Sequence, residues 1–124
     1  MSDLVELKVG GLLPDGNNQG SHILLLKIPQ SSRYLPIWIG PAEASSIAMV
    51  LRGQAFERPL THDLLQHVIE GLDATVQKVV VTTIQDDTFF ARIFLERGEE
   101  IVSIDARPSD CVALAVRVQC PIYC

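Results

Sequence analysis

The feature that most constrains the fold of this chain is a pair of prolines, each of which follows an extended apolar segment. Pro41 and Pro108 both come after aliphatic, strand-like residues. Proline favours the first position of a helix, because its missing N–H would have no partner there in any case. An acid follows each proline two residues later, Glu43 and Asp110, where the helix dipole favours negative charge. The sequence therefore predicts helices that begin at both prolines, each preceded by strands.

The rest of the chain predicts a mixed α+β pattern. The two helices are expected near residues 41–52 and 108–119, and a third near 61–72, with Thr61 as its cap. The third helix has a 3.6-residue apolar period formed by Leu64, Leu65, Val68, Ile69 and Leu72. Strands are expected at residues 4–13, 22–28, 34–39, 76–84, 89–95 and 101–105, and a last one begins at Pro121. Turn formers separate them at residues 14–20, at Asp86-Asp87 and at Gly98. We predict one α+β domain over residues 1–124, with an antiparallel-rich mixed sheet and three helices.

A weak internal repeat appears at an offset of 67 residues. Leu24–Ile28 aligns with Ala91–Leu95, and Glu43 aligns with Asp110, without a gap. Both halves read as a hairpin, a further strand and a proline-initiated helix. Few aligned residues are identical, so coincidence is the alternative to an internal duplication of a β-β-β-α unit. A duplication would place Glu43 and Asp110 at equivalent helix N-termini.

The sequence predicts a cytoplasmic protein with no membrane segment. No apolar run approaches the ~20 residues that cross a bilayer, and the first residues lack the features of a signal peptide. Cys111 lies in an apolar helical stretch and is predicted to be core, while Cys120 and Cys124 lack zinc-ligand spacing. The last strand stops abruptly at Cys124, which suggests a truncated chain. A mean hydropathy of +0.25 predicts self-association, as a dimer built on exposed apolar surface.

The charge balance restricts how this chain could contact nucleic acid. Ten Lys and Arg against fifteen Asp and Glu give a net charge of −5 and a pI near 5.0. Proteins that grip a nucleic-acid backbone usually present a basic face, because neutralised phosphates supply most of the affinity. We therefore expect any contact with nucleic acid to be confined to a local pocket.

Several blocks of the sequence, in order, resemble the signature blocks of the bifunctional nuclease (BFN) domain family. They are Leu35–Gly40, Glu43, Arg58–Leu64, Phe89–Arg92 and Ile104–Asp110. The resemblance covers nearly the whole chain. It departs at Asp86-Asp87-Thr88, where the family often has Asp-Gly, and the C-terminal extension of many members is missing. The resemblance implies an α+β fold, an oligomer and a metal-dependent nuclease that cleaves DNA or RNA phosphodiesters.

The resembling blocks contain the residue types that phosphodiester cleavage needs: carboxylates for a hard cation, a proton carrier, and cations for the phosphate. The predicted catalytic residues are Glu43, His62, Asp105 and Asp110. The predicted substrate-binding residues are Arg58 and Arg107, and Asp63, Asp105 and Asp110 are predicted to hold a divalent metal such as Mg²⁺. We expect Glu43, His62, Asp63, Asp105, Arg107 and Asp110 to gather where three helix N-termini meet, a setting that favours an anion.

Each candidate also has a purely structural interpretation. Glu43, Asp63 and Asp110 lie where helix first turns favour acids without any site. His62 can be a surface histidine, and Asp105 can tie two loops together through Arg107. Trp38 is more readily explained as core or interface than as a platform for base stacking. The alternative function is a non-catalytic oligomeric module that binds a ligand or regulates, which the acidic charge favours.

Overall fold

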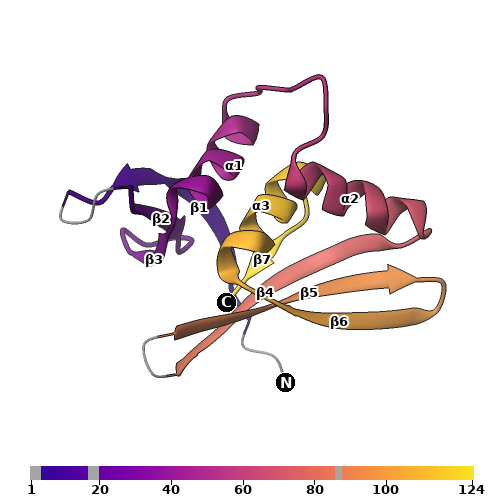
Figure 1. Ribbon diagram of the computed structural model, residues 1–124. Helices are drawn as coiled ribbons and strands as arrows, with labels where there is room; N and C mark the ends of the chain where they lie inside the picture. Colours follow the sequence, from indigo (N-terminus) through magenta and orange to yellow (C-terminus); the bar gives the residue numbers. More distant parts are fainter. Residues whose placement is uncertain (1–3, 17–19, 86–87) are drawn as a thin grey trace.

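The computed structural model describes residues 4–16, 20–85 and 88–124, which form an α+β fold of seven strands and three helices (Figure 1). The strands are β1 (Glu6–Pro14), β2 (His22–Lys27), β3 (Tyr34–Ile39), β4 (Thr75–Gln85), β5 (Thr88–Arg97), β6 (Glu100–Ala106) and β7 (Ile122–Tyr123). The helices are α1 (Pro41–Leu51), α2 (Thr61–Gly71) and α3 (Pro108–Val118). The predicted turn at Asp86-Asp87 lies outside the described residues. Within them, no helix is long and apolar enough to span a membrane.

The three predicted helices are confirmed. Proline stands at the start of α1 and α3, and Gly53, with a φ of 69°, follows the end of α1. The predicted cap of α2 is wrong by one residue. Leu60 is its N-cap, and its backbone N–H donates to the Asp63 carboxylate at 2.9 Å.

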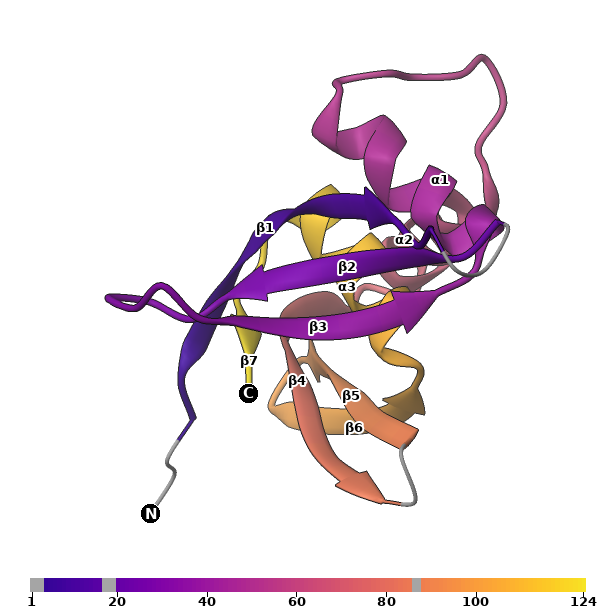
Figure 2. The same cartoon turned by 90° about the vertical axis from the view of Figure 1, so that its left-hand side faces the viewer.

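All three helices lie on one side of a single sheet with the strand order β3-β2-β1-β7-β4-β5-β6 (Figures 1 and 2). The neighbouring strands pair antiparallel except for β7 and β4. The short β7 joins the two halves: Ile122 pairs antiparallel with Leu7 of β1 and in parallel with Val79 of β4.

The two halves share the same strand order and connections. Each is an antiparallel three-stranded unit followed by an 11-residue helix, and the helices begin at Pro41 and Pro108. The hairpins differ in register. Ile37 pairs with Leu24, whereas Ile104 pairs with Ile93, two residues beyond the equivalent position. A shift of two residues keeps each side chain on the same face of the sheet. The apolar residues of the two halves therefore still face the same side.

The core surrounds α3, which lies between α1 and α2 (Figure 1). Five consecutive residues of α3, Cys111 to Ala115, are at most 1% exposed. The predictions of a buried third helix and of a core Cys111 are therefore confirmed. Aliphatic side chains of β2, β4 and β5 fill the space between this helix and the sheet.

Some apolar residues remain exposed, against the sequence pattern. Trp38 is 58% exposed, so its interpretation as a core residue of this chain is wrong. In α2 only Ile69 of the predicted stripe is buried, while Leu64, Val68 and Leu72 are each about half exposed. The helix is amphipathic, but its apolar stripe is wider than the surface that α3 and β4 offer it.

Candidate functional site

The first turns of the three helices meet at one hydrogen-bonded network. Glu43 is the third residue of α1, His62 the second of α2 and Asp110 the third of α3, and Arg107 precedes α3 as its N-cap. The acids of α1 and α3, Glu43 and Asp110, both accept hydrogen bonds from the Arg107 guanidinium. An ordinary helix cap does not need such a shared cation, so this contact favours a site over ordinary caps.

Arg107 links the two halves of the chain at this point. Its Nε donates to Asp110 Oδ2 at 2.9 Å and its Nη2 to Asp110 Oδ1 at 3.0 Å, a two-pronged pair. Its Nη1 donates to Glu43 Oε2 at 2.8 Å. The Arg107 side chain is nevertheless 62% exposed. A guanidinium has more N–H groups than these bonds use, so the cation can still donate to another acceptor.

His62 continues the network into the protein. Its Nε2 lies 2.9 Å from Asp110 Oδ1 and its Nδ1 lies 2.7 Å from the Ser46 hydroxyl. If neutral His62 donates from Nε2, Nδ1 accepts from Ser46; if it is protonated, both nitrogens donate. Sequence reasoning missed Ser46, which is buried. The available signal was its position three residues after Glu43, on the same face of α1.

The network fixes the charges of its members. Burial alone would raise the pKa of Asp110, but hydrogen bonds from Arg107 and His62 outweigh it, and the pKa falls below its usual value. Hydrogen bonding to Asp110, and then the Asp110 and Glu43 charges, raise the pKa of Arg107 above its ordinary value. Near neutral pH, Asp110 is thus an anion and Arg107 a cation.

Asp63 belongs to a different contact. Its Oδ1 accepts from Arg117 Nε at 2.7 Å, and its other oxygen accepts from the Leu60 backbone. The Arg117 side chain is 4% exposed and also donates to the Ala113 carbonyl, one turn earlier in α3. The backbone hydrogen bond and Arg117 lower the pKa of Asp63. Asp63 therefore ties α2 to α3, and the structure does not bring it into the network.

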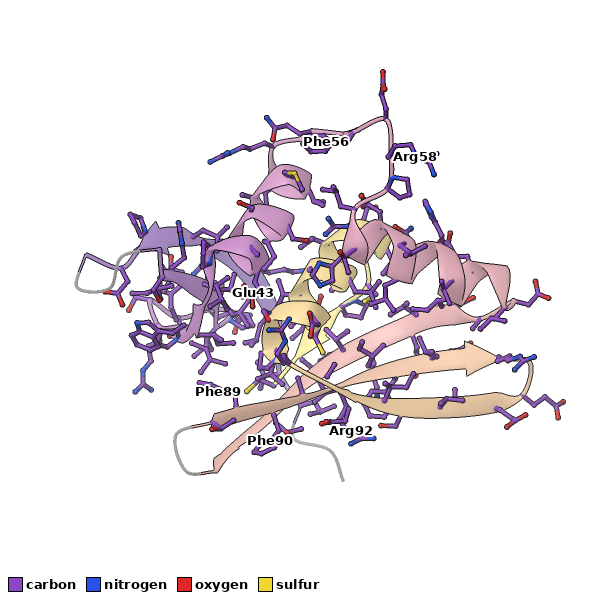
Figure 3. All side chains as sticks on the ribbon, viewed as in Figure 1. Glu43, Phe56, Arg58, Phe89, Phe90 and Arg92 are labelled. Atoms are coloured by element: carbon purple, nitrogen blue, oxygen red, sulfur yellow. The ribbon has the colours of Figure 1, made fainter. Side chains whose placement is uncertain are left out.

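Asp105 and Arg58 also lie apart from the network. Asp105 is exposed on β6, opposite Arg92 of β5, and no hydrogen bond or ion pair of the described residues joins it to His62 or Asp110. Arg58 extends from the segment between α1 and α2, away from Glu43 (Figure 3). Of the predicted metal ligands Asp63, Asp105 and Asp110, only Asp110 belongs to the hydrogen-bonded network. In the described part of the chain, no three His, Cys, Asp or Glu residues are grouped so as to hold a metal ion.

Two cavities adjoin the network and share Glu43 and Arg107 as a wall. The β3 cavity, of about 680 Å³, lies between β3, the start of β5 and the start of α3. The α1–α2 cavity, of about 570 Å³, lies between α1, the start of α2 and the segment that contains Phe56. His62 and Asp110 line the second cavity as well. Both cavities are of a size that holds small ligands.

Comparison with known proteins identifies the family of the chain. The bifunctional nuclease domain matches residues 24–124. An uncharacterized protein of Mycobacterium tuberculosis is 41% identical over 118 residues, which cover 95% of this chain and 70% of that protein. Bifunctional nuclease 1 of Arabidopsis thaliana is 28% identical over 116 residues, 91% of this chain and 35% of the plant protein. Bifunctional nuclease 1 of japonica rice is 28% identical over 105 residues, 82% of this chain and 32% of the rice protein. The chain belongs to the bifunctional nuclease domain family.

Proposed function

We propose that this domain binds the phosphodiester backbone of a nucleic acid at Arg107 and hydrolyses it with His62 as the proton carrier. One observation carries the proposal: Glu43, Arg107, Asp110 and His62 form one continuous network along two cavities. The names of the plant relatives support a nuclease, and the network contains the residue types that phosphodiester hydrolysis uses.

Each member of the network has a distinct task. Arg107 supplies a permanent positive charge and free N–H donors, which stabilise negative charge that builds up on a phosphate. His62 lines the α1–α2 cavity, and imidazole is the side chain that most often serves as a general acid or base. Asp110 orients both the imidazole and the guanidinium. Glu43 holds the other side of Arg107.

Two of the predicted metal ligands, Asp110 and Asp63, have arginine partners. Both oxygens of Asp110 already accept hydrogen bonds from Arg107, and one also accepts from His62. Asp63 is similarly paired with Arg117. A cation at either carboxylate would compete with an arginine for the same negative charge. We therefore assign no step to a metal and treat Mg²⁺ as a variable of the assay.

The decisive experiment measures cleavage of labelled DNA and RNA oligomers by Asp110→Asn, His62→Gln and Asp105→Asn, with and without Mg²⁺. Loss of a general acid or base typically costs ~100-fold or more. We expect that loss for Asp110→Asn and His62→Gln, and an unchanged rate for Glu57→Gln, an exposed control in the α1–α2 segment. An Asp105→Asn loss as large as that of Asp110→Asn, seen only with Mg²⁺, would instead support the metal site predicted from the sequence.

The second candidate is a ligand-binding module without turnover. It is favoured by the neutralisation of Arg107 by two carboxylates, in a chain whose net charge is −5. In that case the same oligomers bind, the Arg107→Gln variant loses binding, and no substrate is cleaved under any metal condition.

A further inference from the structure

The β3 cavity and the α1–α2 cavity lie on either side of Glu43 and Arg107. Glu43 and Arg107 line both, so the exposed guanidinium lies between the β3 cavity and the α1–α2 cavity. A chain-like ligand whose charged group lies on Arg107 can therefore extend into a cavity on either side. A single small anion would leave both cavities empty.

Each cavity also has a large exposed aromatic residue in its lining. Trp38 of the β3 cavity is 58% exposed, and Phe56 of the α1–α2 cavity is 60% exposed. Phe56 lies on the segment that passes above α1 and α2 (Figure 3). Exposed aromatic faces are the surfaces on which unpaired nucleobases stack, with little dependence on sequence.

The charges of the linings indicate what must supply affinity. Of the described residues that line the two cavities, Arg107 is the only lysine or arginine. One cation that already faces two carboxylates gives little backbone affinity, since such affinity grows with the number of phosphates neutralised. Stacking must therefore provide most of it. Bases of a duplex are already stacked on each other, so only unpaired bases are available.

We propose that the substrate is a single-stranded nucleic acid whose phosphodiester group contacts Arg107 while the two flanking nucleotides occupy the two cavities. One base stacks on Trp38 and the other on Phe56. This inference rests on the proposed function and adds to it the substrate class and two base subsites.

The test uses Trp38 as its own reporter, because it is the sole tryptophan of the chain. The fluorescence of the protein is titrated with a single-stranded DNA pentamer, with the same sequence embedded in a longer, stable duplex, and with a pentamer without bases. We expect saturable quenching by the single strand alone. Phe56→Ala weakens its binding by about fivefold or more, which corresponds to ~1 kcal/mol of stacking. Phe90→Ala, an exposed phenylalanine outside both cavity linings, leaves binding unchanged.

Binding of the pentamer to Trp38→Ala is measured by the anisotropy of a fluorescein label on the pentamer. We expect a loss of affinity similar to that of Phe56→Ala, and circular dichroism verifies that the variant is folded. Equal binding of the duplex or of the base-free pentamer would overturn the inference, as would normal binding by Phe56→Ala. Failure of the proposed function looks different: the pentamer quenches Trp38 but is never cleaved. Cleavage at full rate by both Trp38→Ala and Phe56→Ala retains the nuclease and removes the base subsites.

Discussion

Arg107 donates hydrogen bonds to one carboxylate from each half of the chain. Glu43 comes from the helix of the first β-β-β-α unit and Asp110 from the helix of the second. Because a guanidinium is planar and always charged, it can pair with Asp110 through two bonds and still reach Glu43. A lysine at this position could not form the same fork. Its exposure then leaves the charge accessible from both cavities.

Asp63 and Arg117 form the second acid–arginine contact, and it has a structural role. Arg117 is almost fully buried, while the Asp63 side chain is one-third exposed. Removing one partner of a buried pair leaves an unpaired charge, which costs about 3–5 kcal/mol when both groups are buried. The partial exposure of Asp63 reduces that cost to about 2 kcal/mol.

We predict that Asp63→Asn lowers the free energy of unfolding by about 2 kcal/mol at pH 7 and by less near pH 3. The pKa of Asp63 is lower in the folded state than its ordinary value of 3.8. The native carboxylate therefore stabilises the fold above that value, and its contribution is lost as the pH falls through the folded-state pKa. Urea unfolding at both pH values measures the difference. Glu57→Gln, at an exposed position between α1 and α2, serves as the control; an equal effect of Asp63→Asn at pH 7 and pH 3 would contradict the assignment.

The start of α1 shows how one element is shaped around the network. A Cβ atom built on Gly40 would lie 2.6 Å from Glu43 Oε1. The backbone of Gly40 is extended, with a φ of −78°, so other residues could adopt its conformation. Glycine leaves space there for the Glu43 carboxylate, which folds back over the helix start.

We expect Gly40→Ala to displace the Glu43 carboxylate and to reduce pentamer binding and cleavage by about tenfold, since small misplacements in a site are costly. Its effect on unfolding should stay below about 1 kcal/mol, because the carboxylate is at the protein surface. Gly71→Ala is the matched control: it adds the same methyl group at a helix position with open space. Thermal unfolding and the binding assay separate the two effects. Tight binding by Gly40→Ala would show that the position of Glu43 is unimportant.

At the scale of the molecule, the helices cover the sheet unevenly. Val102 and Ile104 of β6 pair with Leu95 and Ile93, which are buried, yet they are themselves 40% and 41% exposed. The helix layer therefore ends above β5. The two edge strands also differ: β3 contains Pro36, which interrupts further pairing, and β6 has no proline, lysine or arginine.

We predict that the chain forms a dimer through the β6 edge, so that a second copy covers Val102 and Ile104. Ile104→Lys places a charge on this edge and should convert the dimer to a monomer at micromolar concentration. Leu13→Lys, at an exposed apolar position of β1, should leave the dimer intact. Sedimentation velocity measures both. A native chain that sediments as a monomer, or equal disruption by the two lysines, would contradict this interface.

The sequence by itself determined the elements and the residue types of the network. Proline and glycine positions, apolar periodicity and β-branched runs are local signals, so the three helices and the succession of strands along each half could be predicted from them. The same signals placed Glu43, His62 and Asp110 at helix starts.

Only the tertiary structure decided which of these starts meet. Asp63 and Asp110 have the same local position, yet their arginine partners differ in origin. Asp110 pairs with Arg107, three residues before it at the same helix start, whereas Asp63 pairs with Arg117, because the packing of α2 on α3 brings these two residues together. Likewise Trp38 and Leu64 fit a core pattern but remain exposed, since burial depends on whether another element covers that face and not on the residue itself.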